Sequence, residues 1–114
     1  MSRTEKNYAH NTQLSTSATD IVATVPTAVV SVVSKLSFYN SSTTNNRQVT
    51  VYAVESGGTA GTGNILAKRS IAPGQTWNVV EAITERLSAG MKLQAVQDSG
   101  TDVNANCSGA DFSA

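Results

Sequence analysis

The sequence predicts an all-β protein built as one antiparallel β-sandwich, and three observations lead to this prediction. Ser and Thr make up about a quarter of the residues and Leu is scarce, which favours strands over helices. Several segments alternate apolar and polar residues with the two-residue period of a strand. Clusters of turn-forming residues separate these segments at short intervals, as is typical of sandwiches and small barrels.

The first half of the chain contains three predicted strands. Ile21–Val25 is a short strand that Pro26 ends. Val29–Tyr39 alternates over its whole length and is predicted to be a long, half-buried strand. A run of Asn, Ser and Thr at 40–46 follows, and Val49–Ala53 then alternates again, so this pair is predicted to form a hairpin.

The second half adds the remaining strands. Asn64–Ile71 stops at a Pro-Gly turn, after which Gln75–Val79 is extended. Met91–Ala95 and Val103–Cys107 are predicted to form a second hairpin. Val79–Leu87 has helical spacing, but nine residues make a marginal helix, so an irregular crossing between strands is favoured over a two-turn helix. The total is seven to eight strands, in a jelly-roll-like or Ig-like arrangement.

The apolar faces of the alternating strands predict the core. A structure with more than about a third of its residues in helices would contradict this prediction. The expected core residues are Val30, Val32, Leu36, Phe38, Val49, Val51, Leu93, Ala95, Val103 and Ala105.

The first 13 residues are predicted to be an extended N-terminal arm, with the sandwich domain over residues 14–114. The arm is polar, and fully stretched it would span roughly 40 Å, enough to reach a neighbouring subunit. Deleting residues 1–13 is expected to leave the sandwich folded. Arg3, Lys6, Tyr8 and His10 are the candidate partner-binding residues of this arm.

Composition excludes several classes of function. A chain of 114 residues is too short for a large enzyme, and its formal net charge of zero gives no field to attract phosphates, so no nucleic-acid partner is expected. The longest apolar run, Ile21 to Val33, is shorter than the ~20 residues that span a bilayer, so no membrane partner is expected. The polar start at Met1 lacks the apolar stretch of a signal peptide, which predicts synthesis in the cytoplasm.

No catalytic, metal or cofactor site is predicted. Cys107 is interpreted as a small buried hydrophobe, although a single cysteine also leaves an intermolecular disulfide open. His10 is the only histidine, so zinc ligands and a nucleophile-base pair are both missing. Asp98–Asp102 is shorter than a calcium loop and is interpreted as a turn. The segment Gly57–Gly63 lacks the lysine of a phosphate loop and is interpreted as a flexible connection.

The order of segments resembles a known family. The resemblance rests on the segments Leu14-Ser15-Thr16-Ser17, Tyr39-Asn40-Ser41-Ser42, Val49-Thr50-Val51-Tyr52-Ala53-Val54, Ile71-Ala72-Pro73-Gly74 and Leu87-Ser88-Ala89-Gly90-Met91. Over about residues 14 to 112, this order is similar to small β-sandwich virion proteins of tailed bacteriophages, which are head decoration, tail or fibre components. The family brings no catalytic residues, and the polar arm is not part of its pattern.

The resemblance implies a capsid decoration (cement) protein that binds and stabilises the head shell. Its expected partners are copies of itself, in an oligomer such as a trimer, and the major capsid protein or other virion proteins. A tail or tail-fibre subunit is the alternative. A carbohydrate-binding module is the second alternative. Tyr39 and Tyr52 lie on the polar faces of two strands predicted to pair, where they would form an aromatic patch. Both tyrosines are candidate partner-binding residues.

Overall fold

The structure, a computed structural model, describes residues 2–113. The strands of this part of the chain are β1 (Ser2–Gln13), β2 (Thr19–Val22), β3 (Val29–Asn40), β4 (Arg47–Val54), β5 (Ile65–Ile71), β6 (Thr76–Asn78), β7 (Arg86–Leu87), β8 (Lys92–Gln97) and β9 (Val103–Ser113). Two 3₁₀ turns, η1 (Thr62–Asn64) and η2 (Val80–Ala82), complete it. All-β architecture is therefore confirmed.

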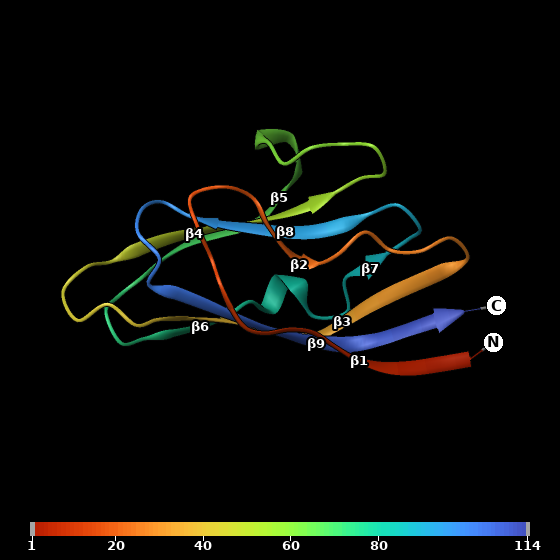
Figure 1. The fold of residues 1–114 in the computed structure, drawn as a ribbon, viewed down its shortest axis with the longest axis horizontal. Helices are drawn as coiled ribbons and strands as arrows, with labels where there is room; N and C mark the ends of the chain where they lie inside the picture. The colour runs from red at the N-terminus through yellow and green to blue at the C-terminus, as the bar shows by residue number, and fades with distance from the viewer. Residues whose placement is uncertain (1, 114) are drawn as a thin grey trace.

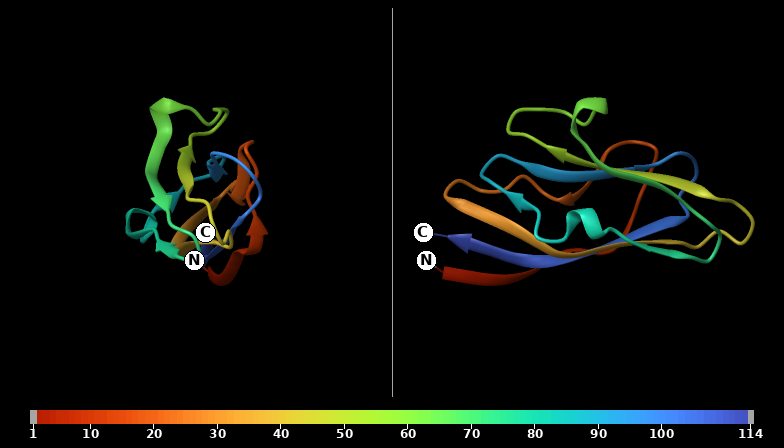
Figure 2. Two further views of the ribbon diagram at one scale, coloured as in Figure 1. Left: turned by 90° about the vertical axis from the view of Figure 1, so that its left-hand side faces the viewer. Right: turned by 180° about the vertical axis from the view of Figure 1, so that it is seen from behind.

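The strands form two antiparallel sheets that pack face to face (Figure 1). In sheet A the order is β1-β9-β3-β6, with β7 also paired to β3, and in sheet B it is β2-β8-β4-β5. Most consecutive strands lie in different sheets, so the chain winds around the sandwich as in a jelly roll. Figure 2 shows the two layers edge-on and both termini at one end of the molecule.

Both predicted hairpins are wrong, because each pair of strands lies in different sheets. β3 pairs with β9, β6 and β7, whereas β4 pairs with β5 and β8. Likewise β8 belongs to sheet B and β9 to sheet A. Alternation shows that one face of a strand is buried. It does not show whether the next strand along the chain pairs with that strand in the same sheet or packs against it from the opposite sheet, because both arrangements give the same pattern.

Buried amides hold two of the crossings between sheets, from β3 to β4 and from β8 to β9. At the end of β3, Asn40 is fully buried; its Nδ2 donates to the carbonyls of Asn45 and Ile71, each at 2.9 Å. At the end of β8, the buried Gln97 donates from Nε2 to the Leu14 carbonyl at 2.6 Å. Such paired amides satisfy backbone carbonyls that would be costly to bury alone.

Two of the predicted core residues, Val30 and Val32, are wrong because β3 contains a bulge. Val33 pairs with Gly109 and Lys35 with Ser108, so Ser34 is an extra residue that shifts the alternation by one. Val30 and Val32 consequently face outward and are only half-buried, whereas Val33 is fully buried. The other eight predicted core residues, from Leu36 to Ala105, are buried as expected.

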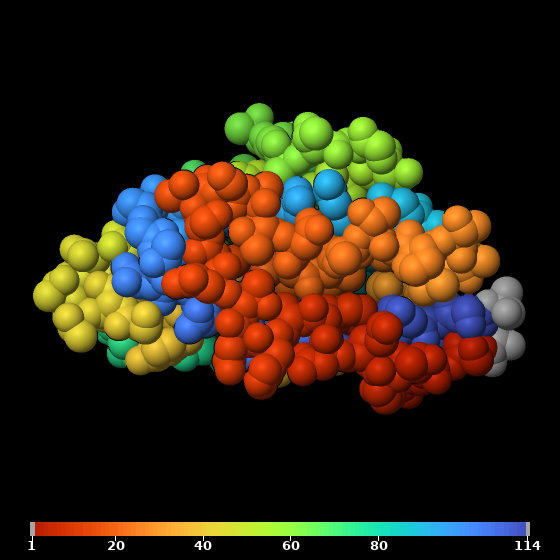
Figure 3. Space-filling model, in the orientation of Figure 1, coloured from red at the N-terminus to blue at the C-terminus, as the bar shows by residue number. Residues whose placement is uncertain are grey.

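The N-terminal segment is extended, as predicted, but it is not a free arm. Ser2–Gln13 pairs with β9 and forms the edge of sheet A, visible in red along the lower surface in Figure 3. Backbone pairing does not require apolar side chains, so a polar sequence can supply an edge strand. Ala9 is buried in the core, so deleting residues 1–13 would remove a core residue and expose the edge of β9.

Residues 79–87 form the η2 turn followed by the short strand β7, in place of a two-turn helix. Val79, Ala82 and Leu87 are buried, but Val80 and Ile83 are exposed. Helical spacing would have placed these two apolar residues inward; a single 3₁₀ turn has a different period and leaves them outside.

Candidate interaction surface

The outward face of sheet A divides into an apolar part and a polar part. Near the chain termini, Val30 and Val32 on β3 pair with Phe112 and Ala110 on β9. We call these four residues the apolar half. All four lie on the side of the sheet that faces away from the core, because the buried residues of β3 before the bulge are Ser31 and Val33.

Beyond the bulge, the same face carries amides and hydroxyls. We call this region the polar half. Its members are Ser37, Tyr39, Thr76, Asn78, Asn104, Asn106 and Ser108, which neighbour one another across β6, β3 and β9. Lys35 pairs with Ser108 beside the bulge and is exposed, so a charged side chain lies where this region meets the apolar half. Tyr39 is the most prominent aromatic of the polar half, with 43% of its surface exposed.

The structure does not gather the six predicted partner-binding residues into one site. Arg3 lies on the outward face, with its guanidinium carbon 5.8 Å from the Phe112 ring centroid, and it also pairs with Glu5 at 2.9 Å. His10 is exposed on β1. Tyr52 is half-buried on β4 in sheet B, whereas Tyr39 lies in sheet A, so the expected two-tyrosine patch does not form.

Tyr8 is an anchor that holds β1 to the rest of sheet A. Its hydroxyl donates to Asp111 Oδ1 at 2.7 Å, and the Ser31 hydroxyl donates to the same oxygen at 2.7 Å. One carboxylate oxygen therefore links strands β1, β9 and β3. Lys6 Nζ lies 3.9 Å from the other oxygen of Asp111. Burial, followed by the adjacent Asp111 carboxylate, raises the pKa of Tyr8, so its hydroxyl remains a donor.

Gly109 makes room for this anchor. A Cβ at Gly109 would collide with the Val32 carbonyl oxygen and would lie 2.9 Å from the Tyr8 ring. The tyrosine ring thus crosses β9 at the position where that strand has no side chain. This contact depends on three-dimensional pairing, and the sequence alone carried no signal for it.

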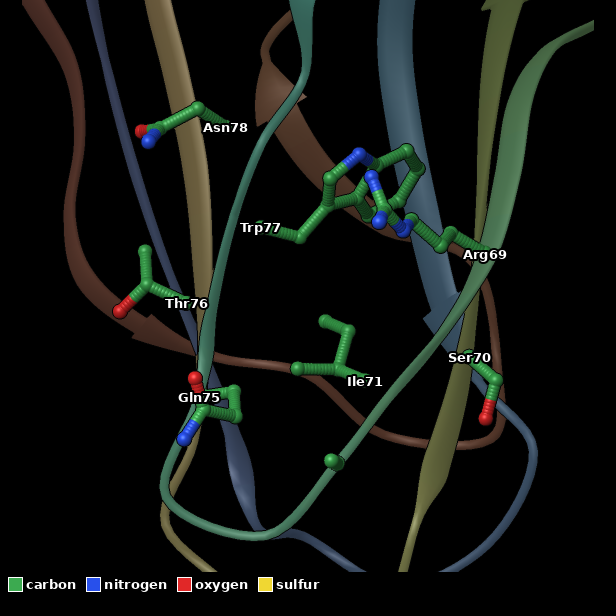
Figure 4. Close-up of a pocket in the computed structure, with 8 residues that line it drawn as sticks. Arg69, Ser70, Ile71, Gln75, Thr76, Trp77 and Asn78 are labelled. Atoms are coloured by element: carbon green, nitrogen blue, oxygen red, sulfur yellow. The ribbon is translucent and has the colours of Figure 1, made fainter.

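A groove of about 450 Å³ lies between β5 and β6, where the edges of the two sheets approach each other (Figure 4). Trp77 from β6 and Arg69 from β5 extend toward one another, with Ile71 beside them, while Thr76 and Asn78 point away. Trp77 is only 6% exposed, and its ring packs 5.8 Å from that of Phe38. The tryptophan therefore serves the core and presents no flat ring for a sugar to stack on.

Cys107 is buried on β9, as predicted for a small hydrophobe. Burial raises the pKa of its thiol to about 12, which keeps the group neutral and unreactive near neutral pH. Over residues 2–113, the structure shows no group of three or more His, Cys, Asp or Glu side chains placed to share a metal ion. In the same residues, none of the helical turns is long and apolar enough to cross a membrane.

No family model and no curated protein matches the sequence significantly. Two solved structures are similar in fold. A chain of the Bacillus endospore appendages, described as disulfide-linked pili, matches with a TM-score of 0.55 and 11% identity, over 97% of this chain and 88% of that one. A chain of the infectious bursal disease virus particle matches with a TM-score of 0.50 and 17% identity, over 96% of this chain and 30% of that one. At such identities, the similarity establishes a shared all-β fold.

Proposed function

We propose that this chain is a non-catalytic structural protein of a virion that associates with copies of itself through the outward face of sheet A. The observation that carries the proposal is the composition of that face. Protein interfaces combine an apolar centre with a hydrated polar surround. Here Val32 and Phe112 share a face with the amides and hydroxyls around Asn106, and Lys35 lies between the two parts.

The two similar folds support an assembly role, since one is described as a pilus protein and the other belongs to a viral particle. Disulfide linkage between subunits is a different matter. Cys107 is 1% exposed and is the only cysteine, so its sulfur is out of reach of a second chain in this fold. We therefore propose assembly through non-covalent contacts.

The particular role that we propose is decoration of a bacteriophage head, as the resemblance implies, with a tail or tail-fibre subunit as the alternative. A small domain buries only about 800 Å² with each partner, so repetition on a lattice would supply the strength of attachment. The major capsid protein, or another virion protein, would be the second partner.

Purified particles test this proposal. Mass spectrometry of particles should detect the chain in stoichiometric amounts, and cryo-electron microscopy should locate it on the head. Val32→Lys should reduce occupancy, whereas Val96→Lys, a matched half-buried valine on sheet B, should not. Absence from purified particles would refute the virion role, and density only on tails would select the alternative.

Carbohydrate binding is the second candidate function, and the exposed Tyr39 favours it. The ring lies between Thr76 and Asn104, whose polar groups suit the hydroxyls of a sugar. A glycan array should then show a ligand that Tyr39→Ala loses and Tyr52→Ala keeps. An array without any ligand would exclude this candidate.

A further inference from the structure

Two exposed apolar side chains beside sheet A have no partner within the described chain. Val80 and Ile83 are 67% and 47% exposed, and we call them the ridge. Glu81 lies between them on the exposed surface, and Glu85 follows. Exposed apolar residues of this size, bordered by charge, are typical of contact sites between proteins.

The ridge is held in place by the backbone. The N–H of Ile83 donates to the Val80 carbonyl at 3.2 Å, and the N–H of Thr84 donates to the Val33 carbonyl of β3 at 2.8 Å. Thr84 adopts a φ of 66°, which costs a β-branched residue energy and is kept only where the surroundings enforce it. The ridge is therefore preorganised and would lose little entropy on binding.

An apolar pocket of about 520 Å³ lies at the terminal end of the sandwich, and we call it the socket. It is lined by Ala28, Val29, Val30, Arg86, Ala89, Phe112 and Ser113. Arg86 is exposed at the socket, and Arg3 lies over its Phe112 ring, where Glu5 pairs with it. Arg86 is thus the charged residue in the lining of the socket, whereas Arg3 lies outside that lining and its charge is offset by Glu5.

The ridge and the socket are complementary in charge and in polarity. Apolar side chains flanked by Glu81 and Glu85 would enter an apolar pocket whose lining includes the positive charge of Arg86. Such opposite potentials select the partner and the orientation of docking. The ridge cannot fill the socket of its own chain, because Arg86 follows Glu85 directly and β7 fixes it against β3.

We propose that two copies of this chain form a two-fold symmetric dimer in which the ridge of each copy enters the socket of the other. The turn η2, which carries the ridge, and strand β7, which borders the socket, are consecutive in the chain, and both lie on the near side of the molecule in the right-hand view of Figure 2. A two-fold axis beside β7 brings both pairs together at once, as isologous contacts require. This inference rests on the proposed self-association and identifies the partner surface.

Sedimentation of the purified chain tests the apolar contact. The wild type should sediment as a dimer, and Ile83→Asp should sediment as a monomer. Ile65→Asp is the matched control, because Ile65 is 39% exposed on β5 and lies outside both surfaces; it should stay dimeric. Circular dichroism should show that both variants are folded. A monomeric wild type, or a trimer or larger ring, would overturn the two-fold dimer.

Charge reversal tests the pairing itself. Glu81→Arg with Glu85→Arg in one variant, and Arg86→Glu in another, should each weaken dimerisation about tenfold or more. Mixing the two variants should restore it, because both contacts of the mixed dimer again join opposite charges. No recovery on mixing would refute the ridge-socket contact. Failure here would leave the occupancy of purified particles unaffected, so it is distinguishable from failure of the virion role.

Discussion

The even-numbered apolar residues of β3 lie on opposite faces of sheet A before and after the bulge. Before the bulge at Ser34, Val30 and Val32 face outward; after it, Leu36 and Phe38 face the core. The residue types are alike, yet one inserted residue makes half of the strand part of the core and leaves the other half on the surface. Substitutions at Leu36 and Phe38 should therefore lower stability, whereas those at Val30 and Val32 should affect association.

The largest effect is expected at Phe38, which is fully buried against Trp77. Phe38→Ala should lower the free energy of unfolding by about 3–5 kcal/mol, because it removes a large core side chain and leaves a cavity. Urea denaturation measures this loss. Tyr39→Ala, the adjacent outward position, should change stability by less than about 0.5 kcal/mol. Equal losses at the two positions would contradict the assigned register.

The next effect concerns the anchor of β1. Asp111→Ala should cost about 1–3 kcal/mol, because the hydroxyls of Tyr8 and Ser31 would lose their shared acceptor. Hydrogen exchange should become faster in β1 in particular. Glu55→Ala, an exposed carboxylate that follows β4, serves as the control and should leave exchange in β1 unchanged. Unaltered protection of β1 in the Asp111 variant would show that the anchor is dispensable.

The buried thiol on β9 predicts a pH dependence. Burial raises the pKa of Cys107 from 9.0 to about 12, so the unfolded chain ionises first as the pH increases. The stability contributed by this group is present below pH 9.0 and is lost as the pH rises toward 12. Between about pH 8 and about pH 10, the wild type should lose roughly 1 kcal/mol more than Cys107→Ala. Parallel losses in denaturation curves would argue against a buried thiol.

The smallest effect on stability is expected before the bulge. Val30→Thr should change the free energy of unfolding by less than about 0.5 kcal/mol, because the side chain is already partly in water. Val49→Thr, at a fully buried position of β4, should cost about 1–3 kcal/mol. Comparing the two by denaturation sharpens the contrast between surface and core valines. A large loss at Val30 would place it in the core.

Alternation along the chain is sufficient to predict the fold class and most of the core, because burial of one face of each strand produces the alternation. The pattern could not reveal the bulge, because Ser34 is an ordinary polar residue in a run of Val and Ser. Nor could it assign strands to sheets, which depends on crossings held by Asn40 and Gln97. Those amides are of types common in turns, and only the folded chain shows that they are buried.

The candidate surface was less accessible to sequence reasoning. Tyr39 was noticed as an aromatic on a polar face, but its pairing with Tyr52 required a hairpin that does not form. The sequence does not predict the apolar half, because its alternation places Val32 in the core. The irregular crossing favoured for residues 79–87 does not indicate which side chains face inward, and the single 3₁₀ turn exposes Val80 and Ile83.

The most direct test of the bulge, and so of the division of sheet A, is the labelling of single cysteines. In a Cys107→Ala background, Val32→Cys and Val33→Cys place a thiol at neighbouring positions, half-buried and fully buried respectively. With the bulge at Ser34, we expect a maleimide to modify the thiol at position 32 quickly in dilute protein. The thiol at position 33 should react only on unfolding. Fast modification at position 33 with protection at position 32 would contradict the bulge at Ser34.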